Sequence, residues 1–556
     1  MSDQVARRAE VVSFELNGAP VEVRASGSSL LDALRGPLGI RSAKDGCSPQ
    51  GQCGCCTVLV DGAPRVACVT PLRRLEGRSV TTLEGLPSAE RDRWTTAFAA
   101  TGASQCGFCT PGIVMRLAAL ARRERPAGHA EVDQALLAHL CRCTGWRSIL
   151  DAWDVATGVV ATPPPRDAAQ LAAAAARAAI EGRAPQQVGP DVAAGGGGFA
   201  EDTAPRESLV ALRTGRPSAA GEADGQRGAT DGWVVAPTLA EARVAAAKVQ
   251  GRNTTAASEH PVPVPPGPWD VTLQTSWVEP AYLETDASWC EPAGVPASPL
   301  ANGGAFGAKV ASPLPEAARR LAAMHGRPVR ALWTREDAVR FGPKRPPLAA
   351  GIDRSARRVV VSVARTPGVA DALRAGFHHR GAGDAAGAVL EIHEVDVVGP
   401  PTALTLRAAG WAEGVVLRAA LDGAAPGSVV GPEGAVVRVA WSAGEGIDLH
   451  VDAGPPLDEA TLRSYCVGAA HMAAGWVCSE SLTTDADGAP VDLTVRSFGV
   501  LRSVDTPRIE AEIVEAAASA RREPVNASDA VFAAVAATLW AAQGFPPAWP
   551  TGLRLR

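Results

Sequence analysis

The sequence predicts an α+β protein of several domains, in which a small sheet-forming region comes first, a helical region follows and a long mixed region completes the chain. Three observations support this. Residues 11–24 and 57–69 alternate apolar and polar positions around tight turns, as β-hairpins do. Residues 113–153 repeat apolar side chains at helical spacing. Strand-like and helix-like segments mix beyond residue 200, and 556 residues exceed what one hydrophobic core holds.

Charge and composition exclude several classes of protein. A net charge of −5 gives no reason to expect a nucleic-acid partner. The N-terminus shows no apolar signal segment, and no stretch reaches the roughly 18 apolar residues of a membrane helix. Nine of the 12 cysteines lie between residues 47 and 143, which a secreted disulfide protein would not show. We therefore expect a cytoplasmic protein without a membrane segment.

The first region, residues 10–85, is predicted to be a small sheet crossed by one helix. An Asn-Gly turn closes the first hairpin, and Ser28 or Ser29 caps the short helix that follows. Residues 57–60 and 66–69 are predicted to form the second hairpin, whose return strand carries a cysteine.

Three further regions follow. Residues 86–160 are predicted to be helical, with antiparallel helices that bring their flanking cysteines to one end of a bundle. Residues 161–198 resemble a linker, because they begin with a proline run, continue with an alanine-rich segment that can form a helix and end with a glycine run. Residues 199–556 read as α+β, with a glycine-rich loop at 301–309 and a helix at 529–542.

Eight cysteines form two sets of four. The first set is Cys47, Cys53, Cys56 and Cys68, and the second set is Cys106, Cys109, Cys141 and Cys143. Two [2Fe–2S] clusters need eight thiolates, four for each cluster. Four thiolates can also hold Zn²⁺, but structural zinc sites favour paired C-x₂-C units, and in the first set two cysteines stand alone. The spacing therefore favours iron–sulfur clusters while zinc stays open, and Cys55 is a spare thiol beside the first set.

Residues 14–153 resemble the iron–sulfur subunit of the xanthine dehydrogenase/aldehyde oxidase family of molybdenum hydroxylases. The motifs that carry the resemblance are Gly46-Cys47 with Cys53-Gly-Cys-Cys56-Thr-Val, Gln105-Cys-Gly-Phe-Cys-Thr-Pro-Gly112 and Cys141-Arg-Cys-Thr-Gly145. The resemblance implies a ferredoxin-like β-grasp domain and a four-helix bundle, each with one [2Fe–2S] cluster. In the family the bundle cluster lies next to the molybdopterin, and Gln105 matches a residue that touches the pterin. The β-grasp cluster passes electrons onward, usually to FAD.

Residues 199–556 resemble an abridged molybdopterin-binding region of the same family. The match to the cofactor-contacting loop consists of Gly303, Gly304, Phe306 and Gly307. Glu523 matches the catalytic glutamate, and a carboxylate beside molybdenum acts as a general base. An ordinary turn stays open for the glycine loop, and a solvated carboxylate stays open for Glu523.

The departures from the family concern the second half. It is much shorter than usual, Val278 replaces a glutamine near the molybdenum, and Arg521 and Arg522 replace glycines. No counterpart of the substrate-binding arginines is evident.

Two functional hypotheses follow from the resemblance. In the first, the chain moves electrons through two [2Fe–2S] clusters from a molybdopterin centre, which hydroxylates a purine-like heterocycle or an aldehyde, to a separate FAD-binding subunit or another acceptor. In the second, the chain is an electron-transfer subunit whose C-terminal half binds no molybdenum and serves for docking or assembly. Both imply an oxidoreductase, and we expect an oligomer.

Overall fold

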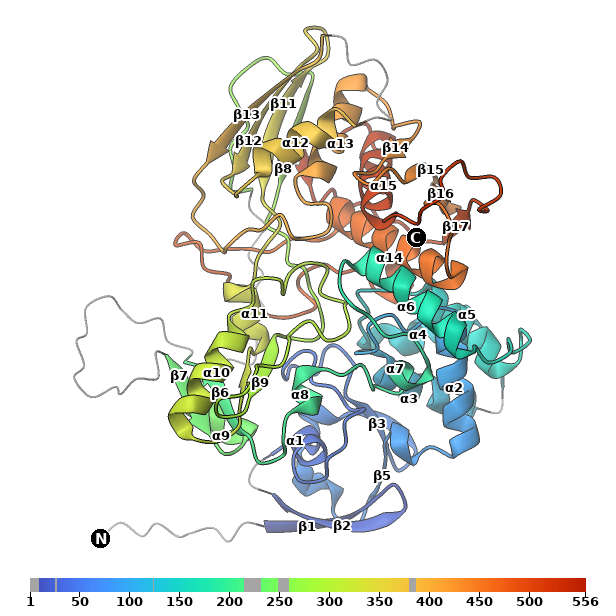
Figure 1. Ribbon diagram of the computed structural model, residues 1–556, viewed down its shortest axis with the longest axis vertical. Coiled ribbons are helices and arrows are strands. Elements are labelled where there is room, and N and C mark those ends of the chain that lie inside the picture. The colour runs from blue at the N-terminus through green and yellow to red at the C-terminus, as the bar shows by residue number, and fades with distance from the viewer. Residues whose placement is uncertain (1–9, 26–27, 124, 215–231, 249–259, 380–386) are drawn as a thin grey trace, which may run out of the picture.

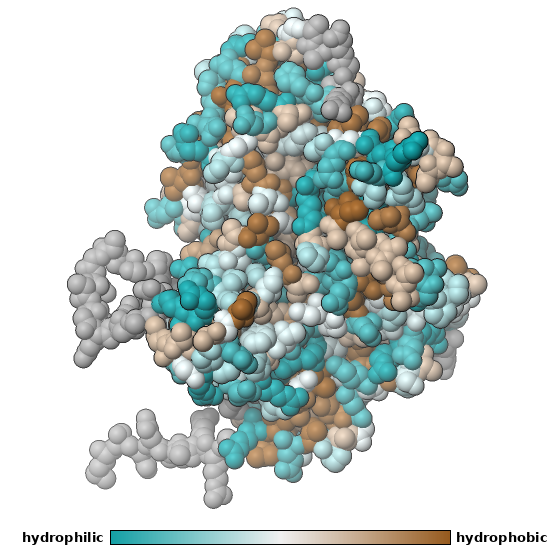
Figure 2. Space-filling model, viewed as in Figure 1, coloured by the Kyte–Doolittle hydropathy of each residue, from teal (hydrophilic) through white to brown (hydrophobic). Residues whose placement is uncertain are grey.

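The computed structural model describes residues 10–25, 28–123, 125–214, 232–248, 260–379 and 387–556. In Figure 1 the chain starts with a small sheet at one end of the molecule, passes through a group of helices beside it, and finishes in sheets and helices at the opposite end. Hydrophilic and hydrophobic residues are interspersed over the face shown in Figure 2. None of the helices in the described ranges is long and apolar enough to cross a membrane. The segment 1–9, predicted to lack a signal, lies outside these ranges.

The first domain is a five-stranded sheet with the order β2-β1-β5-β3-β4, crossed by α1. Its elements are β1 (Glu10–Leu16), β2 (Ala19–Ala25), α1 (Leu30–Arg35), β3 (Thr57–Val60), β4 (Ala63–Val66) and β5 (Ser79–Thr81). Ser29 caps α1, since its hydroxyl accepts a hydrogen bond from the Asp32 N–H at 3.2 Å. The predicted strand 66–69 is wrong, because β4 ends at Val66 and a 3₁₀ turn follows.

Helices α2 to α5 form the second region. They are α2 (Ser88–Ala100), α3 (Thr110–Ala121), α4 (His129–Ala135) and α5 (Arg147–Thr157). Trp94 of α2 and Trp153 of α5 pack with ring centroids 6.0 Å apart, and both are almost fully buried. Aromatic contacts of this kind stabilise the pairing of the two helices beyond their apolar burial.

The segment predicted as a linker packs against both halves of the molecule. It contains α6 (Ala168–Gly182) and α7 (Pro190–Ala193), and α8 (Ala200–Thr203) follows. Glu181 of α6 is buried, and its carboxylate accepts hydrogen bonds from the backbone N–H groups of Ala527 and Ser528 at 2.9–3.2 Å. These residues begin α15 (Ser528–Ala542), so α6 provides the anion that a helix N-terminus favours.

The remaining chain forms three sheets with their helices in the described ranges. One sheet has the order β7-β6-β10-β9, the next β13-β12-β11-β8-β18, and the last β14-β15-β16-β17. The strands are β6 (Leu209–Arg213), β7 (Trp233–Ala236), β8 (Val271–Thr275), β9 (Ala287–Cys290), β10 (Val329–Leu332), β11 (Leu348–Asp353), β12 (Arg358–Ala364), β13 (Val389–Val395), β14 (Val429–Val430), β15 (Val436–Ser442), β16 (Gly446–Asp452), β17 (Ile509–Ile513) and β18 (Ala548–Trp549). The helices other than α15 are α9 (Leu239–Ala245), α10 (Leu314–His325), α11 (Arg335–Phe341), α12 (Val369–Phe377), α13 (Trp411–Asp422) and α14 (Glu459–Cys478). Helices α14 and α15 are almost entirely buried and form the apolar centre of this half.

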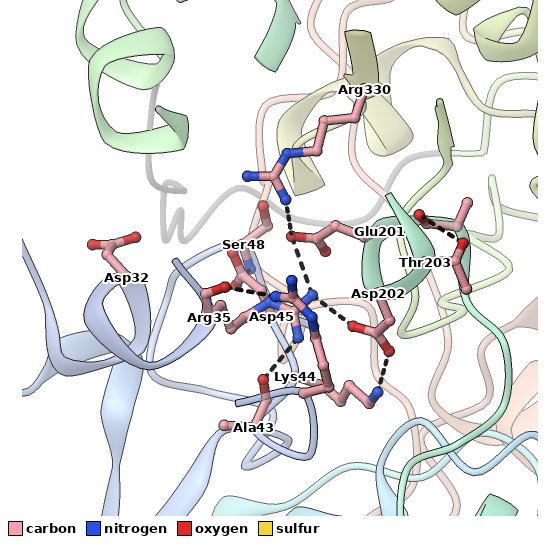
Figure 3. A network of polar contacts seen from close by, with 12 residues as sticks. Asp32, Arg35, Ala43, Lys44, Asp45, Ser48, Glu201, Asp202, Thr203 and Arg330 are labelled. Atoms are coloured by element: carbon pink, nitrogen blue, oxygen red, sulfur yellow. Dashed lines mark hydrogen bonds and ion pairs between the residues drawn. The ribbon is translucent and has the colours of Figure 1, made fainter. Parts of the chain in front are cut away.

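A network of buried charges joins the first domain to the rest of the chain (Figure 3). Asp202 of α8 accepts hydrogen bonds from Arg35, at 2.8 Å, and from Lys44. Glu201 lies 3.3 Å from Arg35 and 3.8 Å from Arg330 of β10. The network fixes the backbone of residues 35–45, which leads directly into the first cysteine loop.

Candidate functional site

The first cysteine set lies at the edge of the first domain. Three of its members occupy the loop between α1 and β3, and Cys68 lies on the 3₁₀ turn Ala67–Val69. The Cys47 thiol contacts the thiols of Cys53 and Cys68, and Cys68 also contacts Cys56. The Cys68 N–H donates to the Cys56 sulfur at 3.4 Å, which turns the chain away from the sheet. All four side chains are at most 5% exposed, so the set is sealed from solvent.

These contacts shift the pKa values of the thiols of the first set in opposite directions. Hydrogen bonds from Cys53 and Cys68 lower the pKa of Cys47, whereas contacts with Cys47 and Cys55 raise the pKa of Cys53. The Gln50 N–H adds a donor to the Cys47 sulfur at 3.1 Å. The contacts within the set therefore stabilise the thiolate of Cys47.

The second cysteine set lies at one end of the helical region. Two members precede α3, and the others lie in the loop that precedes α5. Cys141 contacts Cys109 and Cys143, and the Cys143 and Cys106 sulfurs are 3.6 Å apart. Contacts with Cys109 and Cys143 lower the pKa of Cys141, while the contact with Cys106 raises that of Cys143. The prediction that the two pairs meet at one end of the helical region is confirmed.

The arrangement of the sulfurs fits two-iron clusters. In each set the four thiols lie in neighbouring sulfur–sulfur contacts. A [2Fe–2S] cluster takes two thiolates at each of its irons, so pairs of sulfurs are the donors that it requires.

The two cysteine loops lie directly against each other. The Leu140 N–H, one residue before Cys141, donates to the Cys53 carbonyl at 3.0 Å. Gly54 has a φ of +72°, and a Cβ at this position would meet the His139 ring at 2.4 Å. Glycine is therefore required there for the conformation and for the close approach of the loops. The backbones of the two cysteine loops are thus joined by a hydrogen bond.

Three residues predicted to contact a cofactor lie at the second cysteine set. Gln105 is buried, and its amide N–H group donates to the Cys143 carbonyl at 3.0 Å and to the Ser464 hydroxyl at 2.9 Å. A Cβ at Gly304 would meet the Cys106 side chain at 2.8 Å, so this glycine permits the close approach. Gly303 and Gly304 line a cavity of about 10 Å³ beside Cys106.

A buried ion pair closes that cavity. Lys309 donates to Glu284 at 2.6 Å, and both side chains line the space. Burial raises the pKa of Glu284 to about 7, although Lys309 acts in the opposite direction.

The other predicted residues lie elsewhere. Phe306 lines a second cavity, whereas Gly307 is packed against the Thr405 carbonyl, which a Cβ would meet at 1.7 Å. Glu523 is exposed in the loop between β17 and α15 and lines none of the cavities described here. The structure therefore does not bring Glu523 together with Gln105 and the glycine loop.

Sequence reasoning identified Phe306 and Val278 of the second cavity but missed its arginines and glutamates. Arg142, between two cysteines of the second set, pairs with Glu480 through hydrogen bonds of 2.5 and 2.8 Å. Arg345 pairs with Glu413 through hydrogen bonds of 2.7 and 2.9 Å. The partners are 338 and 68 residues apart, so spacing along the chain gives no signal for them. The only local signal was the arginine inside the Cys141–Cys143 motif.

The residues present do not leave space for a molybdopterin. The second cavity measures about 50 Å³, which is room for about four water molecules. Cofactor pockets typically span about 300–1,000 Å³. Beside the second cysteine set, Gly468 of α14 lies so close to the Cys143 carbonyl that a Cβ would meet it at 1.8 Å. Helix α14 therefore fills the space beside the second set.

Comparisons with known proteins agree with the arrangement of the two cysteine sets. Residues 82–154 match the family described as "[2Fe-2S] binding domain". The chain is 38% identical to the xanthine dehydrogenase iron-sulfur-binding subunit of Escherichia coli O157:H7, across 26% of this chain and 92% of that protein. It is 36% identical to the nicotinate dehydrogenase small FeS subunit of Eubacterium barkeri, across 25% of this chain and 88% of that protein.

A solved structure is similar over almost the whole chain. The aldehyde oxidoreductase from Desulfovibrio desulfuricans superposes with a TM-score of 0.64, covering 95% of this chain and 97% of that chain at 16% sequence identity. At this identity the likeness shows the fold alone, and the mixed α+β fold predicted for the second half is confirmed.

Two sets of four cysteines, one on a small sheet and one on a helical region, define a two-cluster iron–sulfur oxidoreductase. The chain belongs to the xanthine dehydrogenase/aldehyde oxidase family, and it joins the family's iron–sulfur region to a C-terminal half with the aldehyde oxidoreductase fold. The predicted family and the [2Fe–2S] cofactor are confirmed.

Proposed function

We propose that the two cysteine sets hold one [2Fe–2S] cluster each and that the chain carries electrons from a molybdopterin centre on a partner protein to a flavoprotein or another acceptor. Bound clusters supply one-electron storage at two neighbouring positions. The observation that carries the proposal is the hydrogen bond from the Leu140 N–H to the Cys53 carbonyl, which links the two loops at 3.0 Å. The chain's own contribution is to hold both sets buried, close together and in fixed orientation.

The second cavity is too small for a molybdopterin, which supports the proposal that the cofactor is bound by another chain. Gln105 and the glycine loop lie where the resemblance places the pterin, but Gln105 already donates to Cys143 and Ser464. The relatives are named as subunits, which supports assembly with partners. The C-terminal half then serves for docking, and a heterocycle or aldehyde is the substrate class of the assembled enzyme.

Metal analysis tests this proposal. Iron, zinc and molybdenum are measured on anaerobically purified full-length protein from a host that makes the molybdenum cofactor. We expect about four irons per chain, since each [2Fe–2S] cluster holds two, and no molybdenum. Stoichiometric molybdenum with pterin would place the hydroxylase centre in this chain and overturn the assignment to a partner. Zinc in place of iron would overturn the clusters.

Single cysteine variants assign each set. Cys56→Ser and Cys109→Ser should each reduce the iron content to about two and remove one of two electron paramagnetic resonance signals of the reduced protein. Cys290→Ser is the matched control, because Cys290 is equally buried but lies in β9, where its thiol donates to the carbonyl oxygens of Glu291 and Gly294. Loss of iron in the control to the same extent would contradict the assignment.

A further inference from the structure

Arg335 is a buried arginine whose charge has no carboxylate partner. It begins α11 and is 1% exposed. Its Nε and Nη1 atoms are buried without a hydrogen-bond partner. Among the residues that the structure describes, no carboxylate lies within ion-pair distance of its guanidinium. A buried charge without a partner is costly, so what this guanidinium does contact indicates what it is for.

The guanidinium is bonded directly to the first cysteine loop. Nη2 donates to the Gly46 carbonyl at 2.7 Å and to the Leu283 carbonyl at 2.9 Å. The Gly46 carbonyl belongs to the peptide group that joins Gly46 to Cys47, which is a member of the first set. Gly46 also lies against the sulfurs, because a Cβ there would meet the Cys53 sulfur at 3.1 Å. The C-terminal half therefore holds a positive charge one peptide group away from the first set.

The carboxylates close to this contact are engaged elsewhere. Asp45, which directly precedes Gly46, pairs with Arg243 at 2.5 Å. The ring centre of Tyr282 lies 5.8 Å from the Arg335 guanidinium, and the hydroxyl of this tyrosine donates to Asp286 at 2.7 Å. Neither carboxylate forms an ion pair with Arg335, so the charge beside the first set is not neutralised by direct contact.

The arginine of the second cysteine set differs in this respect. Arg142 lies between Cys141 and Cys143, but its guanidinium forms a bidentate pair with Glu480 through hydrogen bonds of 2.5 and 2.8 Å. A carboxylate in such close contact cancels most of the field that the guanidinium exerts on its surroundings. Each set thus has a buried arginine at its loop, and the charge lacks an ion-pair partner only at the first set.

We propose that Arg335 raises the reduction potential of the [2Fe–2S] cluster held by the first set and so favours electron transfer from the second set to the first. The inference rests on the function proposed above. Reduction adds one electron to a site that already carries four thiolates, and a positive charge in the interior of low polarity stabilises the added negative charge. The electron comes from the second set, and no covalent bond forms or breaks.

A redox titration followed by electron paramagnetic resonance tests the role of Arg335 on full-length protein that contains four irons. In Arg335→Gln, which can still donate to the Gly46 carbonyl but carries no charge, the ratio of reduced to oxidised first cluster at a fixed potential should fall about tenfold. This corresponds to a potential lower by about 59 mV for a one-electron couple. The potential of the second cluster should shift by less than half as much, and Cys109→Ser identifies the signal of the first cluster.

Two variants serve as controls. Arg335→Lys retains the positive charge and should restore at least half of the shift, whereas a structural role of the guanidinium would not be restored in this way. Arg73→Gln removes an exposed charge from the first domain, and both potentials should stay unchanged because water and salt screen such a charge.

The outcomes are distinct. An unchanged first cluster in Arg335→Gln, an equal shift of both clusters, or an Arg335→Lys variant that behaves like Arg335→Gln would overturn the role of Arg335. If Arg335→Gln loses iron from the first set, the unmodified chain decides: a first-cluster potential above that of the second cluster supports the proposal, and one at or below it overturns it. Four irons with an unchanged ratio would overturn the role of Arg335 alone, whereas protein without iron would overturn the proposed function.

Discussion

The ion pair between Arg142 and Glu480 provides the most direct measure of how strongly the C-terminal half is held on the second cysteine set. Arg142 lies between Cys141 and Cys143, and Glu480 follows α14. The side chains are 7% and 1% exposed, so water screens the pair very little. Arg142 Nε also donates to the Pro280 carbonyl at 3.0 Å, which fixes the guanidinium in place.

Glu480→Gln removes the negative charge and keeps the shape. It leaves the Arg142 charge buried with a neutral partner, and breaking a buried pair in this way costs about 3–5 kcal/mol. Asp371→Asn is the matched control, because Asp371 pairs with Arg374 at 3.1 Å but the two side chains are 90% and 54% exposed. Such a surface pair contributes about 0–1 kcal/mol.

Urea unfolding, followed by far-ultraviolet circular dichroism and by the visible circular dichroism of the clusters, measures both variants. The free energy of unfolding should fall by the larger amount in Glu480→Gln, and the signal of the second cluster should be lost at a lower urea concentration. A double variant, Arg142→Leu with Glu480→Leu, should recover part of the loss, since no unpaired charge is left. A loss in Glu480→Gln no greater than in Asp371→Asn would refute the argument that this pair joins the two halves.

Three other variants test separate parts of the structure. Glu523→Gln should leave iron content, cluster reduction and stability unchanged within about 0.5 kcal/mol, because this carboxylate is exposed, and loss of cluster reduction would contradict that placement. Gly468→Ala should lower the iron content toward about two per chain, because its Cβ would meet the Cys143 carbonyl at 1.8 Å, and an unchanged metal analysis would contradict the close packing. Burial lowers the pKa of His471 to about 4, below that of an unfolded histidine, so the unfolded chain binds more protons and stability should fall by about 3 kcal/mol between pH 6.5 and 4. His471→Gln should reduce this pH dependence in urea titrations, and an unchanged slope would assign it to other groups.

The sequence predicted those parts of the site whose residues are close together along the chain. The spacing of the cysteines predicted the two sets, and in the structure the thiols of each set lie in contact. Regular elements with a strong apolar pattern were also predicted well, since the helix expected at 529–542 is α15, Ser528–Ala542. Cys68 was expected on a strand but lies on a 3₁₀ turn, because its N–H donates to the Cys56 sulfur instead of a neighbouring strand.

Composition was a poor guide where long-range contacts decide the structure. The proline and glycine content of residues 161–198 indicated a linker, yet Glu181 of this segment is fully buried against the start of α15. Likewise, the motif around Glu523 gave no information about whether its loop faces inward. The sequence of one segment does not show which distant residues will pack against it. The burial of Glu181 and the exposure of Glu523 therefore become known only from the folded structure.

The same limit explains why a loop that matches a cofactor site in sequence can have another role in the structure. Gln105 and Gly304 occupy positions beside the second cysteine set that suit a pterin, but the amide of Gln105 is bonded to Cys143 and Ser464, and Gly304 packs on Cys106. The contacts with Ser464 and Gly304 attach the C-terminal half to the cysteine loops, and the contact with Cys143 joins the two loops of the second set. Because such contacts exclude water, they keep the second set in a medium of low polarity, where nearby charges act strongly. Under the proposed function, the C-terminal half therefore sets the electrostatic environment of the electron carrier without binding the molybdenum cofactor itself.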